Sequence, residues 1–162
     1  MLFDSHAHIN EASYSPEERA ELIRNIEDSD VDYVADIGYD LASSKLAVEH
    51  AAQYPWCYAV VGCHPHDAKS MDDMELAMYK GLARKKKVVA IGEIGLDFHY
   101  DHSPRDIQRE WFRRQIRLAN QLKMPIVIHS READQETMDI LKEEFNCFYG
   151  CSIIDHTQTR IK

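Results

Sequence analysis

The sequence has 162 residues, of which 44% are apolar and 29% are charged, so it suits one globular domain with a buried core. Its net charge of −9 excludes a protein that coats DNA through basic side chains, and no window approaches the roughly 18 uncharged apolar residues of a membrane span. Polar Asp4 and His6 stand where a signal peptide would need its basic and apolar stretches, so we expect a cytoplasmic protein that does not contact membranes.

Short apolar strands alternate with amphipathic helices along the chain. The expected strands are Met1–Phe3, Val31–Ile37, Cys57–Val61, Val88–Ile91 and Ile126–Ile128. The expected helices are Ser15–Asp28, Ala42–Gln53, Asp72–Lys85, Arg105–Lys123 and Glu132–Glu144. Apolar, β-branched strands that alternate with helices are typical of a parallel sheet with helices on its faces.

Two of these helices carry readable signals. Ser15 is the expected N-cap of the first, and Pro16 occupies its first helical position. In Arg105–Lys123, apolar residues such as Trp111 and Phe112 fill one half of the helical wheel and arginines fill the other. We therefore expect an outer helix that covers the sheet, with its arginines in solvent rather than on nucleic acid.

The four cysteines form neither a CxxC pair nor a disulfide-like framework. They are Cys57, Cys63, Cys147 and Cys151. We expect buried thiols of an intracellular protein rather than disulfides or a cysteine metal site.

Ligand-type residues end four of the expected strands. His6 and His8 stand two apart at the first strand's end, so both imidazoles can face one ion, although two surface histidines would show the same pattern. Glu93 follows a fully apolar strand, where a carboxylate needs a cation or a helix cap to satisfy it. His64 and His129 follow the third and fifth strands. Because parallel α/β folds place active sites at the carboxyl ends of their strands, we expect a metal site there.

Four segments, in this order, resemble motifs of the TatD family of metal-dependent deoxyribonucleases. They are Asp4–His8, Gly62–His66, Ala90–Asp97 and Pro125–Ala133. The resemblance covers residues 1–144 and implies a TIM-barrel hydrolase of the amidohydrolase type. It also implies two divalent metal ions (Mg, Mn or Zn) and cleavage of phosphodiester bonds in DNA, as single strands or strand ends.

The resemblance also assigns roles to individual residues. His6 and His8 would hold one metal ion, and His129 would hold the second. Glu93 would bridge both ions and is the expected catalytic residue. His64 and Arg131 would lie near the substrate phosphate.

The resemblance weakens after residue 144. Asn146 stands where the family has a further histidine, and His156 is an alternative substitute ligand, while the family's later aspartate ligand has no counterpart. Residues 151–162 show neither a helical nor a strand pattern. We therefore divide the chain into a barrel portion, 1–144, and a divergent or truncated tail, 145–162.

The expected fold is α/β, a partial (β/α)₈ TIM barrel with about five of its strand–helix units, because a closed barrel typically needs about 250 residues. Its first and fifth strands would be open edges, so we expect impaired activity and self-association through those edges. Two alternatives stay open. One is another binuclear amidohydrolase acting on a small molecule, although no lysine ends a strand to bridge its metals. The other is an inactive fragment.

Overall fold

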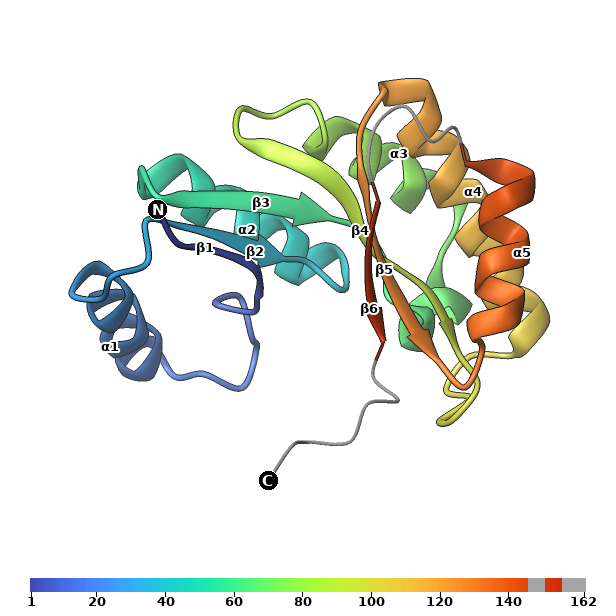
Figure 1. Cartoon of the computed structure of the whole chain (residues 1–162), viewed down its shortest axis with the longest axis horizontal. Coiled ribbons are helices and arrows are strands. Elements are labelled where there is room, and N and C mark those ends of the chain that lie inside the picture. The colour runs from blue at the N-terminus through green and yellow to red at the C-terminus, as the bar shows by residue number, and fades with distance from the viewer. Residues whose placement is uncertain (146–150, 156–162) are drawn as a thin grey trace.

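The computed structural model describes residues 1–145 and the backbone of 151–155. A single sheet of six parallel strands runs in the order β1-β2-β3-β4-β5-β6 (Figure 1). The strands are β1 (Phe3–Ala7), β2 (Tyr33–Ile37), β3 (Cys57–Val61), β4 (Val88–Asp97), β5 (Ile126–Arg131) and β6 (Cys151–Asp155). The helices are α1 (Pro16–Glu27), α2 (Leu41–Gln53), α3 (Asp73–Leu82), α4 (Arg105–Leu122), α5 (Asp134–Glu144) and the short 3₁₀ helix η1 (Pro65–Ser70). The predicted half-barrel of five strand–helix units is therefore confirmed.

The sheet curves like the wall of a barrel. Two strands separate β1 from β4, so a flat sheet would hold them about 14 Å apart at the usual strand spacing. Yet His6 Nε2 of β1 lies 3.6 Å from Glu93 Oε2 of β4. Only an inward curvature brings these side chains together, and it creates the site described below.

The helices supply the outer half of the core. On α4, Trp111, Phe112 and Ile116 are buried against the sheet, as the helical wheel predicted. The arginines of α4 face solvent in part and also pair with acids: Arg109 pairs with Glu136 and Arg117 with Glu144, both on α5. This face of α4 is therefore tied to its neighbouring helix.

The inner face of the sheet presents apolar side chains that no helix within residues 1–145 covers (Figure 1). Phe3, Tyr33 and Val89 are 52%, 37% and 38% exposed. They line an open hollow of about 500 Å³ together with Val60 and Val127. Among the described residues, this is an unusually apolar surface for a sheet that meets solvent.

Several strand bounds differ from the sequence-based prediction. β1 spans Phe3–Ala7 instead of Met1–Phe3, β2 begins at Tyr33 instead of Val31, and β5 continues to Arg131 instead of ending at Ile128. β4 continues to Asp97 instead of ending at Ile91, so Glu93 lies within the strand. β6 forms in the segment that was expected to be irregular, and it pairs in parallel with β5. That expectation was wrong because hydrogen bonds to an existing strand edge can order a short segment whose own pattern is weak. The open edges are accordingly β1 and β6, rather than the first and fifth strands.

Within the described residues, none of the helices has the length and apolar character needed to cross a membrane.

Candidate metal centre

The predicted site residues meet at the carboxyl end of the sheet. His6 lies in β1 and His8 just after it, Glu93 lies in β4, and His129 lies in β5. His64 caps the start of η1 directly after β3. The resulting pocket has a volume of about 350 Å³. Its lining residues are His8, Glu11, Tyr39, His64, His66, Asp67, Glu93, His129 and Arg131.

His6, His8 and Glu93 form one group of candidate metal ligands. The Nε2 atoms of the two histidines lie 3.2 Å apart, and Glu93 Oε2 lies 3.6 Å from His6 Nε2 and 3.9 Å from His8 Nε2. His8 Nδ1 lies 2.8 Å from the carbonyl oxygen of Ile37, which can only accept a proton. Nδ1 of His8 therefore carries the hydrogen, and its Nε2 lone pair faces the group.

His64, Glu93 and His129 form a second group. Glu93 Oε1 lies 3.2 Å from His129 Nδ1. The two carboxylate oxygens of Glu93 thus face two different groups, Oε2 toward β1 and Oε1 toward β5. A carboxylate so placed can bridge two ions.

The donor set fits divalent metal ions. Two ligand atoms of one tetrahedral zinc ion lie about 3.3 Å apart, because each lies about 2.0–2.1 Å from the metal. The His6–His8 and Glu93–His129 contacts, at 3.2 Å each, match that spacing. Imidazole and carboxylate ligands together suit zinc or manganese, and a nuclease can also use magnesium.

His64 is better suited to donate to a substrate than to bind a metal. Its Nδ1 accepts a hydrogen bond of 3.1 Å from the backbone N–H of His66. Burial lowers the pKa of His64 well below its usual range, and the neighbouring His129 and His66 lower that pKa further. A neutral ring with Nδ1 engaged as an acceptor carries its proton on Nε2, so it offers a hydrogen-bond donor to the pocket.

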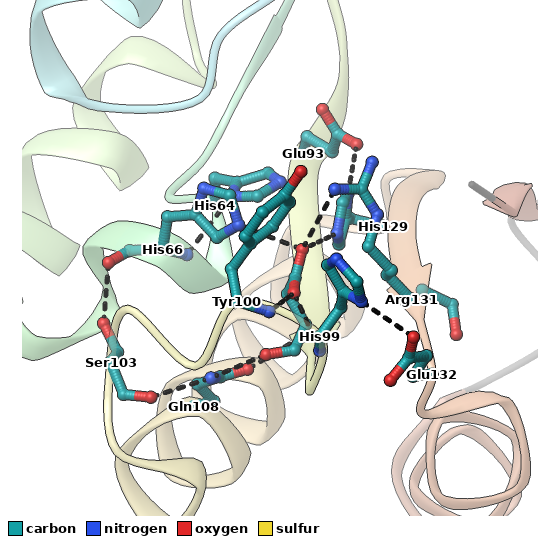
Figure 2. A network of polar contacts seen from close by, with 12 residues as sticks. His64, His66, Glu93, His99, Tyr100, Ser103, Gln108, His129, Arg131 and Glu132 are labelled. Atoms are coloured by element: carbon teal, nitrogen blue, oxygen red, sulfur yellow. Dashed lines mark hydrogen bonds and ion pairs between the residues drawn. The ribbon is translucent and has the colours of Figure 1, made fainter. Parts of the chain in front are cut away.

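Arg131 also reaches the pocket. Its guanidinium lies 5.0 Å from the centre of the Tyr100 ring, and its Nη1 lies 3.9 Å from Asp97 Oδ2. Figure 2 shows that the side chain of His66, from η1, converges with those of His129 and Arg131, both from β5. The arginine supplies the positive charge that an anionic substrate would meet at this rim.

Sequence reasoning did not choose Asp97 as a site residue. Asp97 ends β4 and is fully buried, hydrogen-bonded to His66 and His129. A signal was present in the sequence, because Asp97, like Glu93, is an acid that follows an apolar strand. Asp4, two residues before His6, accepts the backbone N–H of His6.

The two weakest ligand candidates, Asn146 and His156, lie outside the residues that the structure describes. The other predicted ligands are brought together, and the arrangement supplies donors for two ions on either side of one carboxylate.

Comparison with known proteins agrees with this geometry. The profile of a family described as "TatD related DNase" matches residues 3–159. The chain is 42% identical over 158 residues to the uncharacterized metal-dependent hydrolase YabD of Bacillus subtilis, and 30% identical over 159 residues to the 3'-5' ssDNA/RNA exonuclease TatD of Escherichia coli K12. These matches cover 93% and 98% of this chain, but 62% and 61% of the two relatives.

Solved structures show the same partial correspondence. The structure of YJJV, a TatD homologue from Escherichia coli K12, superimposes with a TM-score of 0.79 at 28% identity. It matches 88% of this chain and 56% of YJJV. A TatD-family hydrolase from Entamoeba histolytica shares the fold, with a TM-score of 0.78 at 22% identity. The chain thus spans about three fifths of the length of these relatives.

Proposed function

The chain belongs to the TatD family, and from this premise we propose that it is a metal-dependent hydrolase that cleaves phosphodiester bonds of DNA. The observation that carries the proposal is the position of Glu93, whose two oxygens face separate groups of histidine nitrogens. Phosphodiester cleavage needs a nucleophile at neutral pH and neutralisation of charge on phosphorus, and a two-ion centre answers both needs.

The proposed division of labour follows from the contacts. His6 and His8 would hold one ion, His129 the other, and Glu93 would contact both. Divalent ions, when bound, would lower the pKa of a coordinated water and offset the phosphate charge. His64 would donate its Nε2 proton in a hydrogen bond to a phosphate oxygen, and the Arg131 guanidinium would attract the same group.

Two other functions compete with this one. A binuclear amidohydrolase for small molecules would use a similar pocket, and an inactive fragment would bind no substrate at all. The bridging position held by a glutamate, together with relatives named as DNA and RNA exonucleases, favours DNA. We propose impaired activity for these 162 residues, because the described part of the chain offers few ligands beyond Glu93 and its histidine neighbours.

The direct test measures cleavage of a labelled single-stranded oligonucleotide with Mg²⁺, Mn²⁺ or Zn²⁺. We expect slower cleavage than by Escherichia coli TatD, and a further loss of at least ~100-fold in Glu93→Gln, because the loss of an ion costs several kcal/mol in the transition state. Glu49→Gln, the same change at a position of α2 outside the pocket, is the control and should cleave like the unchanged chain.

The outcomes separate the three functions. Equal cleavage by Glu93→Gln and Glu49→Gln would refute the proposed site. Turnover of a small ester without cleavage of DNA would favour the small-molecule amidohydrolase. Absence of bound metal in elemental analysis, together with absence of turnover, would favour an inactive fragment.

A further inference from the structure

Asp97 belongs to neither of the two groups of candidate ligands, yet it sits directly behind one of them. Its side chain is fully buried at the end of β4. Asp97 Oδ2 lies 2.8 Å from His129 Nε2 and 2.9 Å from His66 Nε2. One carboxylate oxygen is therefore the hydrogen-bond partner of two imidazole nitrogens, which come from different elements.

The carboxylate is held in a fixed orientation. Its other oxygen, Oδ1, accepts the backbone N–H groups of Tyr100 at 2.9 Å and His99 at 3.2 Å. The buried Gln108 side chain of α4 accepts the backbone N–H of Asp97 at 2.8 Å and donates to its carbonyl oxygen at 3.1 Å. With Oδ1 committed to the backbone, Oδ2 remains directed at the two histidines.

The contacts of Asp97 decide which histidine nitrogens carry protons. Oδ1 accepts two backbone N–H groups and Oδ2 meets two imidazole nitrogens, and a single hydroxyl hydrogen on Oδ2 could not serve both rings. An ionised carboxylate only accepts hydrogen bonds. Both imidazoles must therefore present an Nε2–H to Asp97.

We propose that Asp97 is a positioning residue that fixes His129 with its proton on Nε2 and its Nδ1 lone pair directed at the second metal position. His129 Nδ1 lies on the side of Glu93, 3.2 Å from Oε1. Carboxylates that hold the far nitrogen of a metal-binding histidine in this way orient the ring and increase its basicity. The inference rests on the proposed metal centre, but it concerns the protonation of His129 rather than catalysis.

The same carboxylate extends the arrangement to His66. Because His66 and His129 share Oδ2, His66 is tied to the ligand ring although its own nitrogens are absent from both ligand groups. Ser103 Oγ donates to the His66 carbonyl oxygen at 2.8 Å, and Gln108 Nε2 donates to the Ser103 carbonyl oxygen at 2.8 Å. Asp97 therefore joins η1, β4 and β5 behind the ligands.

The first experiment reads the protonation of His129 directly. Long-range ¹H–¹⁵N spectra of the metal-free chain distinguish a histidine that carries its proton on Nε2 from one that carries it on Nδ1, and a His129→Gln spectrum assigns the signal. We expect His129 to carry a proton on Nε2, and Zn²⁺ to shift its Nδ1 resonance. A neutral His129 with its proton on Nδ1 alone would overturn the proposal, whether or not any variant folds.

The second experiment replaces Asp97 with asparagine. Because Oδ1 must keep accepting two backbone N–H groups, the amide NH₂ of Asp97→Asn would face the histidines and force His129 to carry its proton on Nδ1. We expect affinity for the second zinc ion to fall by about 10- to 100-fold in calorimetric titration, with the first ion retained. Asp101→Asn, an exposed acid in the same loop, is the matched control.

The two proposals fail in different ways. Second-ion affinity of Asp97→Asn within twofold of Asp101→Asn would refute the positioning role. Correct protonation and metal binding without DNA cleavage would refute the proposed function and leave the positioning role intact.

Discussion

Three histidines of the site have their proton placed by a neighbour. The Ile37 carbonyl holds the Nδ1 proton of His8, and the backbone N–H of His66 occupies Nδ1 of His64. Asp97 Oδ2 is the hydrogen-bond partner of His129 Nε2. The His8 and His129 rings, both proposed to bind metal, would thus turn a lone pair toward an ion held beside Glu93, whereas His64 turns a proton to the pocket. The difference in role between chemically identical side chains follows from these partners.

A residue-scale prediction concerns Cys57, which is fully buried in β3. Burial, together with nearby Asp36, raises the pKa of the Cys57 thiol to about 12. At pH 8 only about one thiol in ten thousand would be ionised, and the thiolate is the reactive form. We expect Cys57 to resist a disulfide reagent at pH 8 until the protein unfolds.

The measurement uses a chain in which Cys63, Cys147 and Cys151 are replaced by serine, so that colour develops from one thiol. In urea the reaction should become fast, because the pKa of Cys57 returns to an ordinary value near ~8.5. Rapid reaction of Cys57 in the folded chain would contradict the burial of β3.

At the scale of the element, β4 depends on a close approach to β5. Gly95 has φ +147°, and a Cβ built on it would lie 1.9 Å from the carbonyl oxygen of His129. Only glycine fits there, because any side chain would push apart the two strands that carry Glu93 and His129.

Two glycine-to-alanine substitutions test this close approach, and their effects on the free energy of unfolding should have opposite signs. Gly95→Ala should destabilise the fold by more than ~2 kcal/mol through the backbone clash and strain. Gly81→Ala in α3 is the control, because nothing lies within 4 Å of the position that its new methyl group would take, and it should stabilise by about 0.5–1 kcal/mol. Urea unfolding midpoints measure both changes. A neutral Gly95→Ala would contradict the close packing of β4 on β5.

The elements could be predicted from sequence to the extent that their own residues specify them. Ser15 forms the expected cap of α1, in a capping box with Glu18, since a serine N-cap and a glutamate three residues on are local signals. The end of β4 could not be predicted, because Gly92 looks like a strand terminator in the sequence although the strand continues to Asp97. A glycine required by a neighbouring strand looks, in sequence, like a glycine required by a turn.

The candidate site also contains residues that could be predicted from the sequence and one that could not. His6, His8, Glu93 and His129 could be chosen from sequence because their types and strand-end positions carry the chemistry. Asp97 could not be ranked, because its role depends on His66 and His129, 31 and 32 residues away along the chain. Residue type indicates what a side chain can do, whereas only the packed sheet decides which partner it meets.

At the scale of the whole molecule, the uncovered inner face predicts association of copies of this chain. Phe3, Tyr33 and Val89 expose apolar surface beside an open hollow, and the sheet has open edges at β1 and β6. Both features favour contact with a second sheet of the same kind. We expect light scattering after gel filtration to give a mass above 18.8 kDa that rises with concentration.

Val89→Lys places a charge on this inner face and should shift the population toward the monomer. Met74→Lys, at an exposed position of α3 away from the hollow, is the control and should leave the association unchanged. An unchanged chain that stays monomeric at high concentration would contradict the prediction.

The curvature that brings His6 to Glu93 also has a kinetic consequence. The proposed ligands come from β1, β4 and β5, so the centre is complete only after strands that are far apart in the sequence have joined one sheet. Contacts between residues so distant in sequence form late and slowly, because their loop-closure entropy must first be overcome. Ion capture during refolding should therefore lag behind the formation of secondary structure, and a metal-sensitive dye would then time the closing of the sheet.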